Sequence, residues 1–154
     1  MTTGFLGFNL KNQTALIGGS GDGVFSCSIR ATVVSALVEI LRQPEKSKNR
    51  YMYVSALETS QNQLLAVLEK KLNTKFTVTH TKIEDMIKEG KEGVAKGDFM
   101  AAAKLALVAA FSGDYGNNFA AGGMLANEEF GIPKEDLEKT VTDILNANGY
   151  SVSL

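Results

Sequence analysis

The chain reads Asn49-Arg50-Tyr51-Met52-Tyr53-Val54-Ser55 and continues, after a short gap, as Thr59-Ser60-Gln61-Asn62-Gln63-Leu64-Leu65. Aromatic and β-branched residues make the stretch 51–55 typical of a strand. Ser60 and Gln63 have the S-x-x-Q spacing of a capping box, which predicts that a helix begins there. The stretch 76–81 then alternates between apolar and polar residues, as a second strand does. Strand, helix and strand at this spacing predict a right-handed βαβ unit.

The residues before this unit predict a hairpin and a helix. A short strand at 14–17 and another at 24–27 flank the turn Gly18–Gly23. These glycines invite comparison with a phosphate-binding loop, but a dinucleotide fingerprint needs G-x-G-x-x-G opening a helix directly. Extended residues follow here, so the hairpin turn is the favoured interpretation. A helix is expected over 30–42, because its apolar residues recur on one face, and Pro44 should end it.

The C-terminal half is expected to be helical. A second capping box, Thr81 with Glu84, predicts a helix to about Lys96, and Asp98 should cap a helix over 99–111. The latter is apolar nearly all round, so we expect it to be buried on several sides. Two more helices are predicted, at 124–130 and from Pro133 to the residues before Gly149. The expected fold is α/β or α+β, with a small mixed sheet and about six helices in a single domain over 1–154.

Composition excludes several function classes. The chain has 154 residues, of which 44% are hydrophobic and 21% charged, as in soluble globular proteins. A net charge of −1 argues against nucleic-acid binding, which needs a basic face. The apolar run 101–111 is shorter than the roughly 20 residues that span a bilayer, so no membrane association is expected. The single cysteine allows no internal disulfide and favours a reducing compartment, the cytoplasm.

Few side chains suggest catalysis. His80 is the only histidine, so a multi-histidine metal site is excluded and no metal is expected. It is either a base beside a serine or, as we favour, a strand-end residue partly covered by Phe76 and Val78. Cys27 is either a reactive thiol or, as we favour, a small core residue. No tyrosine is followed four residues later by lysine, and no catalytic residue can be named.

Several runs carry a family resemblance. They are Gly4–Phe8, Asn49–Tyr51, Lys96-Gly97-Asp98-Phe99, Leu125–Glu128 and Ile132–Leu137. In this order they resemble the C-terminal half of NmrA-like and isoflavone-reductase-like proteins, fungal members above all. These are atypical short-chain dehydrogenase/reductase relatives with a Rossmann-type fold. The resemblance implies NADP(H) or NAD(H) as the cofactor of a complete protein. It also implies that the dinucleotide-binding N-terminal half is absent here, so the chain alone should not bind the cofactor.

The same resemblance implies a substrate side lined by aromatic residues. The candidates are Phe5, Phe8, Phe111, Tyr115 and Phe119, and the implied ligand is small and apolar or phenolic. Ordinary packing of the C-terminal helices also accounts for these residues and is the favoured alternative.

Three functions remain open at this level. The chain is the substrate-side portion of an NAD(P)H-dependent reductase, inactive alone; or it is an NAD(P)-sensing regulator that binds a protein partner, in which case it could act in the nucleus. The third is a truncated or decayed paralogue. Without the Rossmann half we predict an exposed apolar patch and self-association.

Overall fold

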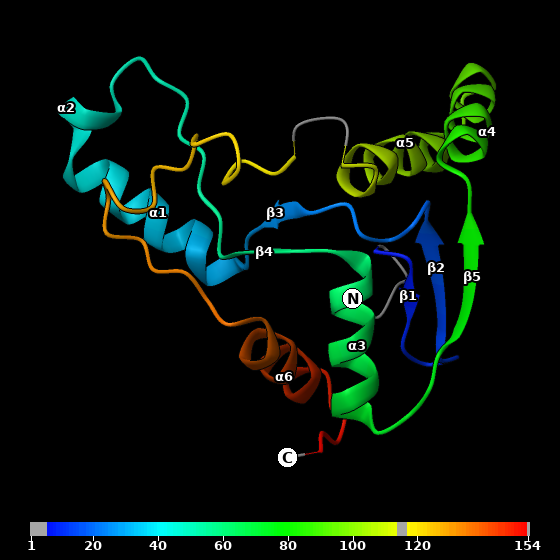
Figure 1. The fold of residues 1–154 in the computed structure, drawn as a ribbon. Helices are drawn as coiled ribbons and strands as arrows, with labels where there is room; N and C mark the ends of the chain where they lie inside the picture. The colour runs from blue at the N-terminus through cyan, green and yellow to red at the C-terminus, as the bar shows by residue number, and fades with distance from the viewer. Residues whose placement is uncertain (1–5, 114–116, 154) are drawn as a thin grey trace.

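A computed structural model describes residues 6–113 and 117–153, which form two small sheets and six helices (Figure 1). The strands are β1 Phe8–Asn9, β2 Thr14–Gly18, β3 Phe25–Cys27, β4 Leu57–Thr59 and β5 Thr77–Thr81. The helices are α1 Arg30–Arg42, α2 Pro44–Ser47, α3 Gln61–Leu72, α4 Ile83–Ala95, α5 Phe99–Phe111 and α6 Leu137–Ala147. The predicted mixed class is therefore confirmed, including the number of helices in the described residues.

The strand pairing differs from the prediction. One sheet has the order β1-β2-β5, with β1 antiparallel and β5 parallel to β2, so it is mixed as expected. The other pairs β3 with β4 antiparallel, Phe25 facing Thr59. The predicted hairpin between 14–17 and 24–27 is wrong, because β2 and β3 belong to different sheets. The predicted βαβ unit is also wrong, because β5 pairs with β2 and not with the strand before α3.

The strand expected at 51–55 begins later, because a side chain forms hydrogen bonds with the backbone groups of Ser55. The amide of buried Asn127 accepts a hydrogen bond from the Ser55 N–H at 3.1 Å and donates one to the Ser55 carbonyl at 2.8 Å. A single bridge between Tyr53 and Leu125 remains in this stretch. The strand observed in this region is β4, which begins at Leu57, directly after Ala56.

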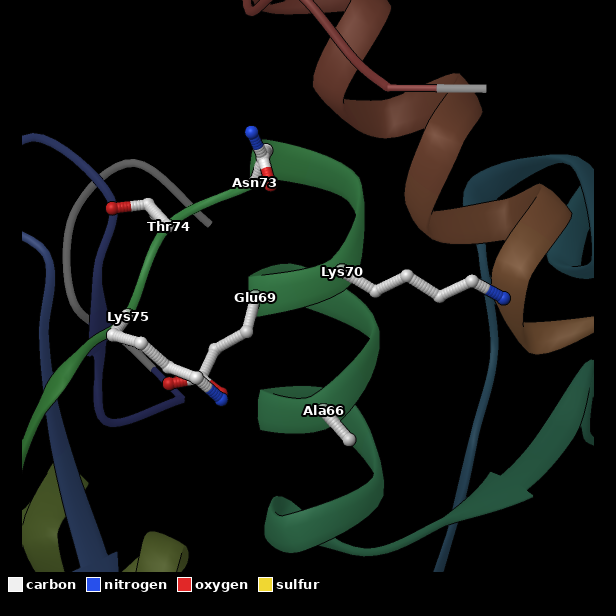
Figure 2. A pocket seen from close by; sticks show the side chains of 6 residues that line it. All are labelled: Ala66, Glu69, Lys70, Asn73, Thr74 and Lys75. Atoms are coloured by element: carbon white, nitrogen blue, oxygen red, sulfur yellow. The ribbon is translucent and has the colours of Figure 1, made fainter.

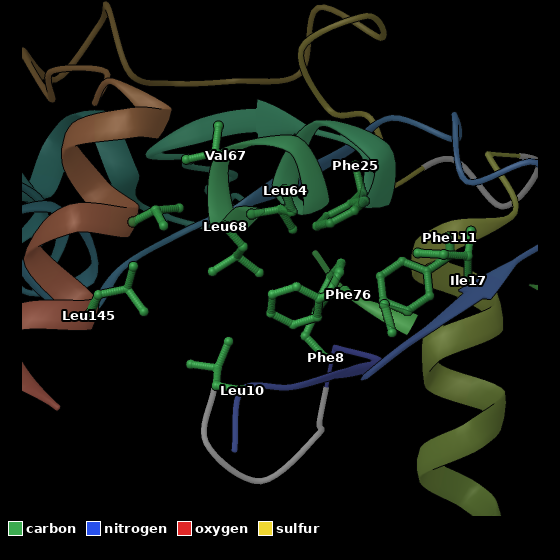
Figure 3. Packing of buried hydrophobic residues seen from close by; sticks show 12 residues of the cluster. Phe8, Leu10, Ile17, Phe25, Leu64, Val67, Leu68, Phe76, Phe111 and Leu145 are labelled. Atoms are coloured by element: carbon green, nitrogen blue, oxygen red, sulfur yellow. The ribbon is translucent and has the colours of Figure 1, made fainter. Parts of the chain in front are cut away.

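Helix α3 organises the main core. Its capping box is present as predicted: the Ser60 hydroxyl accepts from the Gln63 N–H, and the Gln63 side chain accepts from the Ser60 N–H. Leu64, Val67 and Leu68 are buried against the β1-β2-β5 sheet and α6. Figure 3 shows these side chains in one cluster with the rings of Phe8, Phe25, Phe76 and Phe111.

Buried Gln61 joins α3 to the sheet. Its carbonyl oxygen accepts from the Gly18 N–H at 2.8 Å, and its nitrogen donates to the carbonyls of Leu16 and Leu6. A polar side chain this deeply buried is stabilising only because these partners are present.

Several helix ends depart from the prediction. The Thr81–Glu84 capping box does not form: α4 follows Lys82, and no side chain caps it. Asp98 does cap α5, through the Met100 N–H at 2.8 Å. Residues 124–130 form turns and not a helix, and α6 begins only at Leu137, capped by Asp136. A short helix, α2, begins at Pro44, where the helix before it was expected to end.

Helices α4 and α5 pack very closely, while the start of α5 is open to solvent. A Cβ atom on Gly93 would lie 2.3 Å from the Cβ of Ala101, so only small residues allow this approach. Ala101, Val108 and Phe111 of α5 are buried, but Phe99 and Met100 are exposed. The expectation that α5 is buried on several sides is therefore wrong for its first turn.

Helix α1 lies at the edge of the molecule (Figure 1). Ala36 packs on a second, smaller cluster with Ala126, Phe130 and Ile132. Of the apolar stripe that periodicity assigned to α1, Ile40 packs on this cluster, but the valines and leucines are exposed. An exposed apolar patch was predicted, and it lies here.

Candidate functional site

An apolar cleft of about 670 Å³ lies between the β3–α1 turn and α6. Its volume falls in the range of roughly 300–1,000 Å³ that small-molecule sites occupy. The walls come from the β3-β4 sheet, the first turn of α1, α3 and α6. The apolar lining residues include Leu6, Phe25, Leu57, Leu64, Val141 and Ile144.

The floor of the cleft is fixed by hydrogen bonds around Cys27. Its carbonyl accepts from the Ala56 N–H at 2.8 Å and from the Ser55 hydroxyl at 3.1 Å. Ser28, one residue on, donates its hydroxyl to the Val54 carbonyl at 3.1 Å. The β3–α1 turn is therefore held in place before α1 begins at Arg30.

The Cys27 thiol lines this cleft but is a poor nucleophile. Burial, followed by the charge of Glu58, raises the pKa of the Cys27 thiol to about 11, although Lys134 acts in the opposite direction. The thiolate is the reactive form, so at neutral pH this side chain stays protonated. This favours the small packing role over the reactive one.

The polar groups of the cleft are few. Arg30 lines it, and within the described residues its guanidinium has no ion-pair partner. Thr140 lines it from α6, and its hydroxyl is shielded from solvent without a hydrogen-bond partner. Lys139 and Asp143 form an exposed ion pair of 2.7 Å among the lining residues, and Glu135 adds a carboxylate. The cleft can thus bind an apolar ligand with a few polar groups.

The substrate-side aromatic residues expected from the sequence lie mostly elsewhere. Phe8 and Phe111 are buried in the main core, and the Phe111 ring stands edge-on to that of Phe25, with centroids 5.4 Å apart. Phe119 packs on Tyr53, with ring centroids 4.8 Å apart. Neither Phe8, Phe111 nor Phe119 lines the cleft, although Leu6 and Phe25 do. Their contact with a substrate stays a prediction.

Two of the expected site residues, Phe5 and Tyr115, fall outside the part of the chain that the structure describes. The cleft residues that sequence reasoning missed are those of α6 and β4. The apolar stripe of α6 was visible in the sequence, but periodicity cannot tell a stripe that fills the core from one that lines a cleft.

The backbone N–H groups of the glycine-rich loop Gly18–Gly23 form hydrogen bonds within the protein. The N–H groups of Gly18, Gly19 and Gly21 donate to Gln61, to the Thr81 carbonyl and to the Gly18 carbonyl. Asn62 donates to the carbonyl of Ser20 and to the carboxylate of Asp22. Since these amides are engaged and β3 follows instead of a helix, the loop does not fit a dinucleotide pyrophosphate.

His80 lies outside the cleft. It is exposed, with its Nδ1 atom 3.2 Å from the Gly19 carbonyl, and no hydrogen bond to a serine is present among the described residues. In the same residues there is no cluster of three His, Cys, Asp or Glu side chains that could hold a metal ion. No helix of the described chain is both long and apolar enough to cross a membrane.

A second hollow, at the C-terminal end of α3, is polar and open (Figure 2). Glu69 pairs with Lys75 and accepts from the Phe76 N–H at 2.9 Å, and these two hydrogen bonds lower the pKa of its carboxyl. Lys70 pairs with Glu138 at 2.7 Å. Because its charges are already paired at the surface, this hollow is a weaker candidate than the cleft.

Comparison with known proteins gives relatives among oxidoreductases. The chain is 31% identical over 141 residues to oxidoreductase aprR of Aspergillus flavus, covering 92% of this chain and 48% of that protein. It is 26% identical over 92 residues to oxidoreductase poxI of Penicillium oxalicum, covering 60% of this chain and 29% of the relative. The chain thus spans about half the length of aprR, and its match to poxI covers a smaller share of that protein. No family model matches it.

The fold has a counterpart among solved structures. An NADPH-dependent quinone oxidoreductase from Escherichia coli superposes with a TM-score of 0.52 at 19% identity, covering 89% of this chain and 48% of the other. That likeness concerns the fold alone. The sequence relatives, for their part, support a relationship to oxidoreductases.

Proposed function

We propose that this chain is the substrate-side portion of an NAD(P)H-dependent oxidoreductase of the NmrA-like and isoflavone-reductase-like type. The observation that carries the proposal is the apolar cleft between the β3–α1 turn and α6. It accepts a small apolar or phenolic ligand, whose ring packs against Phe25, Leu57 and Ile144. A ligand hydroxyl or carbonyl pairs with Arg30 or with the Thr140 hydroxyl, which would otherwise remain unsatisfied at a cost of about 1–3 kcal/mol.

The chain alone has no reductase activity in this proposal. A bound nicotinamide cofactor would supply the hydride, but the Gly18–Gly23 loop does not fit its pyrophosphate. The Cys27 thiol is protonated and so is no nucleophile, and His80 lies outside the cleft. The residues that line the cleft bind the ligand, orient it and exclude water from one side of it.

Two titrations test the proposal. We expect no heat when NADPH is titrated into the chain, and micromolar binding would mean that Gly18–Gly23 or another surface holds the cofactor. We expect 2-naphthol to shift the NMR signals of the cleft residues. The variant Ile144→Trp should remove those shifts by filling the cleft, whereas Leu16→Trp on the exposed side of β2 should leave them unchanged. Equal shifts in both variants would contradict a site in the cleft.

A regulatory role is the second candidate, and the exposed apolar stripe of α1 favours it. In that case the chain acts by binding a protein and not by turning over a substrate. A pulldown that yields no specific protein would count against the regulator, and NADPH-dependent turnover by the chain alone would overturn the proposal of inactivity.

A further inference from the structure

One side of α1 is apolar and open to solvent. Val33, Val34, Leu37, Val38 and Leu41 are 52, 56, 57, 39 and 71% exposed. Their spacing places them in one continuous stripe along about two and a half turns of the helix. We call these five residues the α1 apolar face.

This face is not needed to hold α1 in place. The opposite side of the helix is anchored by buried Thr32 and Ala36 and by partly buried Ile40, against Phe130 and Ile132. Isolated apolar residues on a surface need no explanation, but a contiguous stripe of five marks a contact surface. Between Val33 and Leu41 the one charged residue is Glu39, which pairs with Arg42 at 2.8 Å.

The relatives extend beyond the region that this chain matches. The match to aprR uses 92% of this chain but only 48% of that protein, and the solved neighbour is likewise covered to 48%. In both, an amount of chain similar to this one lies outside the match. Those residues need apolar surface to pack against, and the described fold offers it along α1.

We propose that the α1 apolar face is the docking surface for a polypeptide equivalent to the portion of aprR that this chain does not match. The contact is apolar at its centre, formed by Leu37 with Val34 and Leu41. Arg30, near the first turn of α1 and lining the cleft, brings the docked polypeptide next to the candidate site. The identity of the partner rests on the proposed function, whereas the docking surface itself does not.

Co-purification is the first test. The unmatched portion of aprR, carrying an affinity tag, is co-expressed with this chain. We expect the wild-type chain to be captured and Leu37→Lys to reduce capture at least about tenfold, since a buried charge at the centre of an interface costs well over the 1.4 kcal/mol that tenfold represents. The matched control is Phe99→Lys, an equally polar change at an exposed apolar residue of α5. Capture that is lost in both variants, or in neither, overturns the proposal.

A chimera tests the same surface without depending on association in solution. The unmatched portion of aprR is joined to this chain in the order found in aprR, and Leu37→Cys is labelled with a maleimide. We expect labelling at least about tenfold slower in the chimera than in the chain alone, because docking covers the thiol. Phe99→Cys should react equally in both. Equal rates for L37C overturn the proposal.

A second copy of this chain is the competing occupant. Sedimentation across a concentration series decides it: if the chain dimerises and L37K abolishes the dimer, the face is a self-association surface and the proposal is overturned. Neither labelling nor sedimentation needs NADPH or naphthol. Failure of the docking surface is therefore distinguishable from failure of the proposed ligand site.

Discussion

Helices α1 and α3 are alike in sequence terms and opposite in structure. They have 13 and 12 residues, and both are amphipathic. Helix α3 buries Leu64, Val67 and Leu68, whereas α1 leaves its valines and leucines exposed. The difference shows that periodicity determines which side of a helix seeks an apolar partner but not whether the chain supplies that partner.

The largest contrast should come from truncating one leucine in each helix. Leu68→Ala in α3 should lower the free energy of unfolding by about 2–5 kcal/mol, because it opens a cavity in the main core. Leu37→Ala in α1 should change it by less than about 0.5 kcal/mol. Urea denaturation measures both. Similar losses in the two variants would show that α1 is packed in solution and that the comparison is wrong.

A smaller effect is expected at the polar joint between α3 and the sheet. Gln61→Leu leaves the Gly18 N–H and the Leu16 carbonyl buried without a partner, which should cost about 1–3 kcal/mol. Asn62→Ala, the next residue, removes exposed hydrogen bonds only and should cost less. If the order of the two variants were reversed in the same denaturation experiment, Gln61 would not be the joint.

The ion pair between Glu58 and Lys134 should make the stability of the protein depend on pH. Burial acts to raise the pKa of Glu58, but hydrogen bonds from Lys134 and Ser55 outweigh it, so the pKa lies below its usual range. Because the pKa is lower in the folded state, the stabilisation is complete above the ordinary glutamate pKa and is lost as pH falls through the folded value. At pH 7 the free energy of unfolding of the wild type should exceed that of Glu58→Gln by about 0.2–1 kcal/mol. A gap that persists at pH 2 would contradict this origin.

The smallest effect on stability belongs to the α1 apolar face. Leu41→Gln should leave the free energy of unfolding within about 0.5 kcal/mol of wild type, since this side chain is 71% exposed. It should nevertheless lower the fluorescence of a bound hydrophobic dye, which reports exposed apolar surface. An unchanged dye signal would mean that the patch does not bind such probes.

Much of the local structure was predictable because it depends on neighbours in the chain. The helix over 30–42, the Ser60–Gln63 capping box and the Asp98 cap were all expected and are present. The capping box expected at Thr81 was wrong, although its spacing was equally good, because the sequence motif does not fix the backbone angle at the cap. The helix expected at 124–130 was replaced by turns that place Asn127 against Ser55.

The sequence by itself determined the fold class, the main helices and the position of the apolar stripe on α1, because these follow from the periodicity of contacts three and four residues apart. Only the tertiary structure decided that β2 pairs with β5, that Gln61 is buried, that Phe8 and Phe111 lie in the core, and that the cleft opens beside α6. Each depends on residues far apart in the chain, such as Gly18 with Gln61. A single sequence does not show which of its many compatible long-range pairs form.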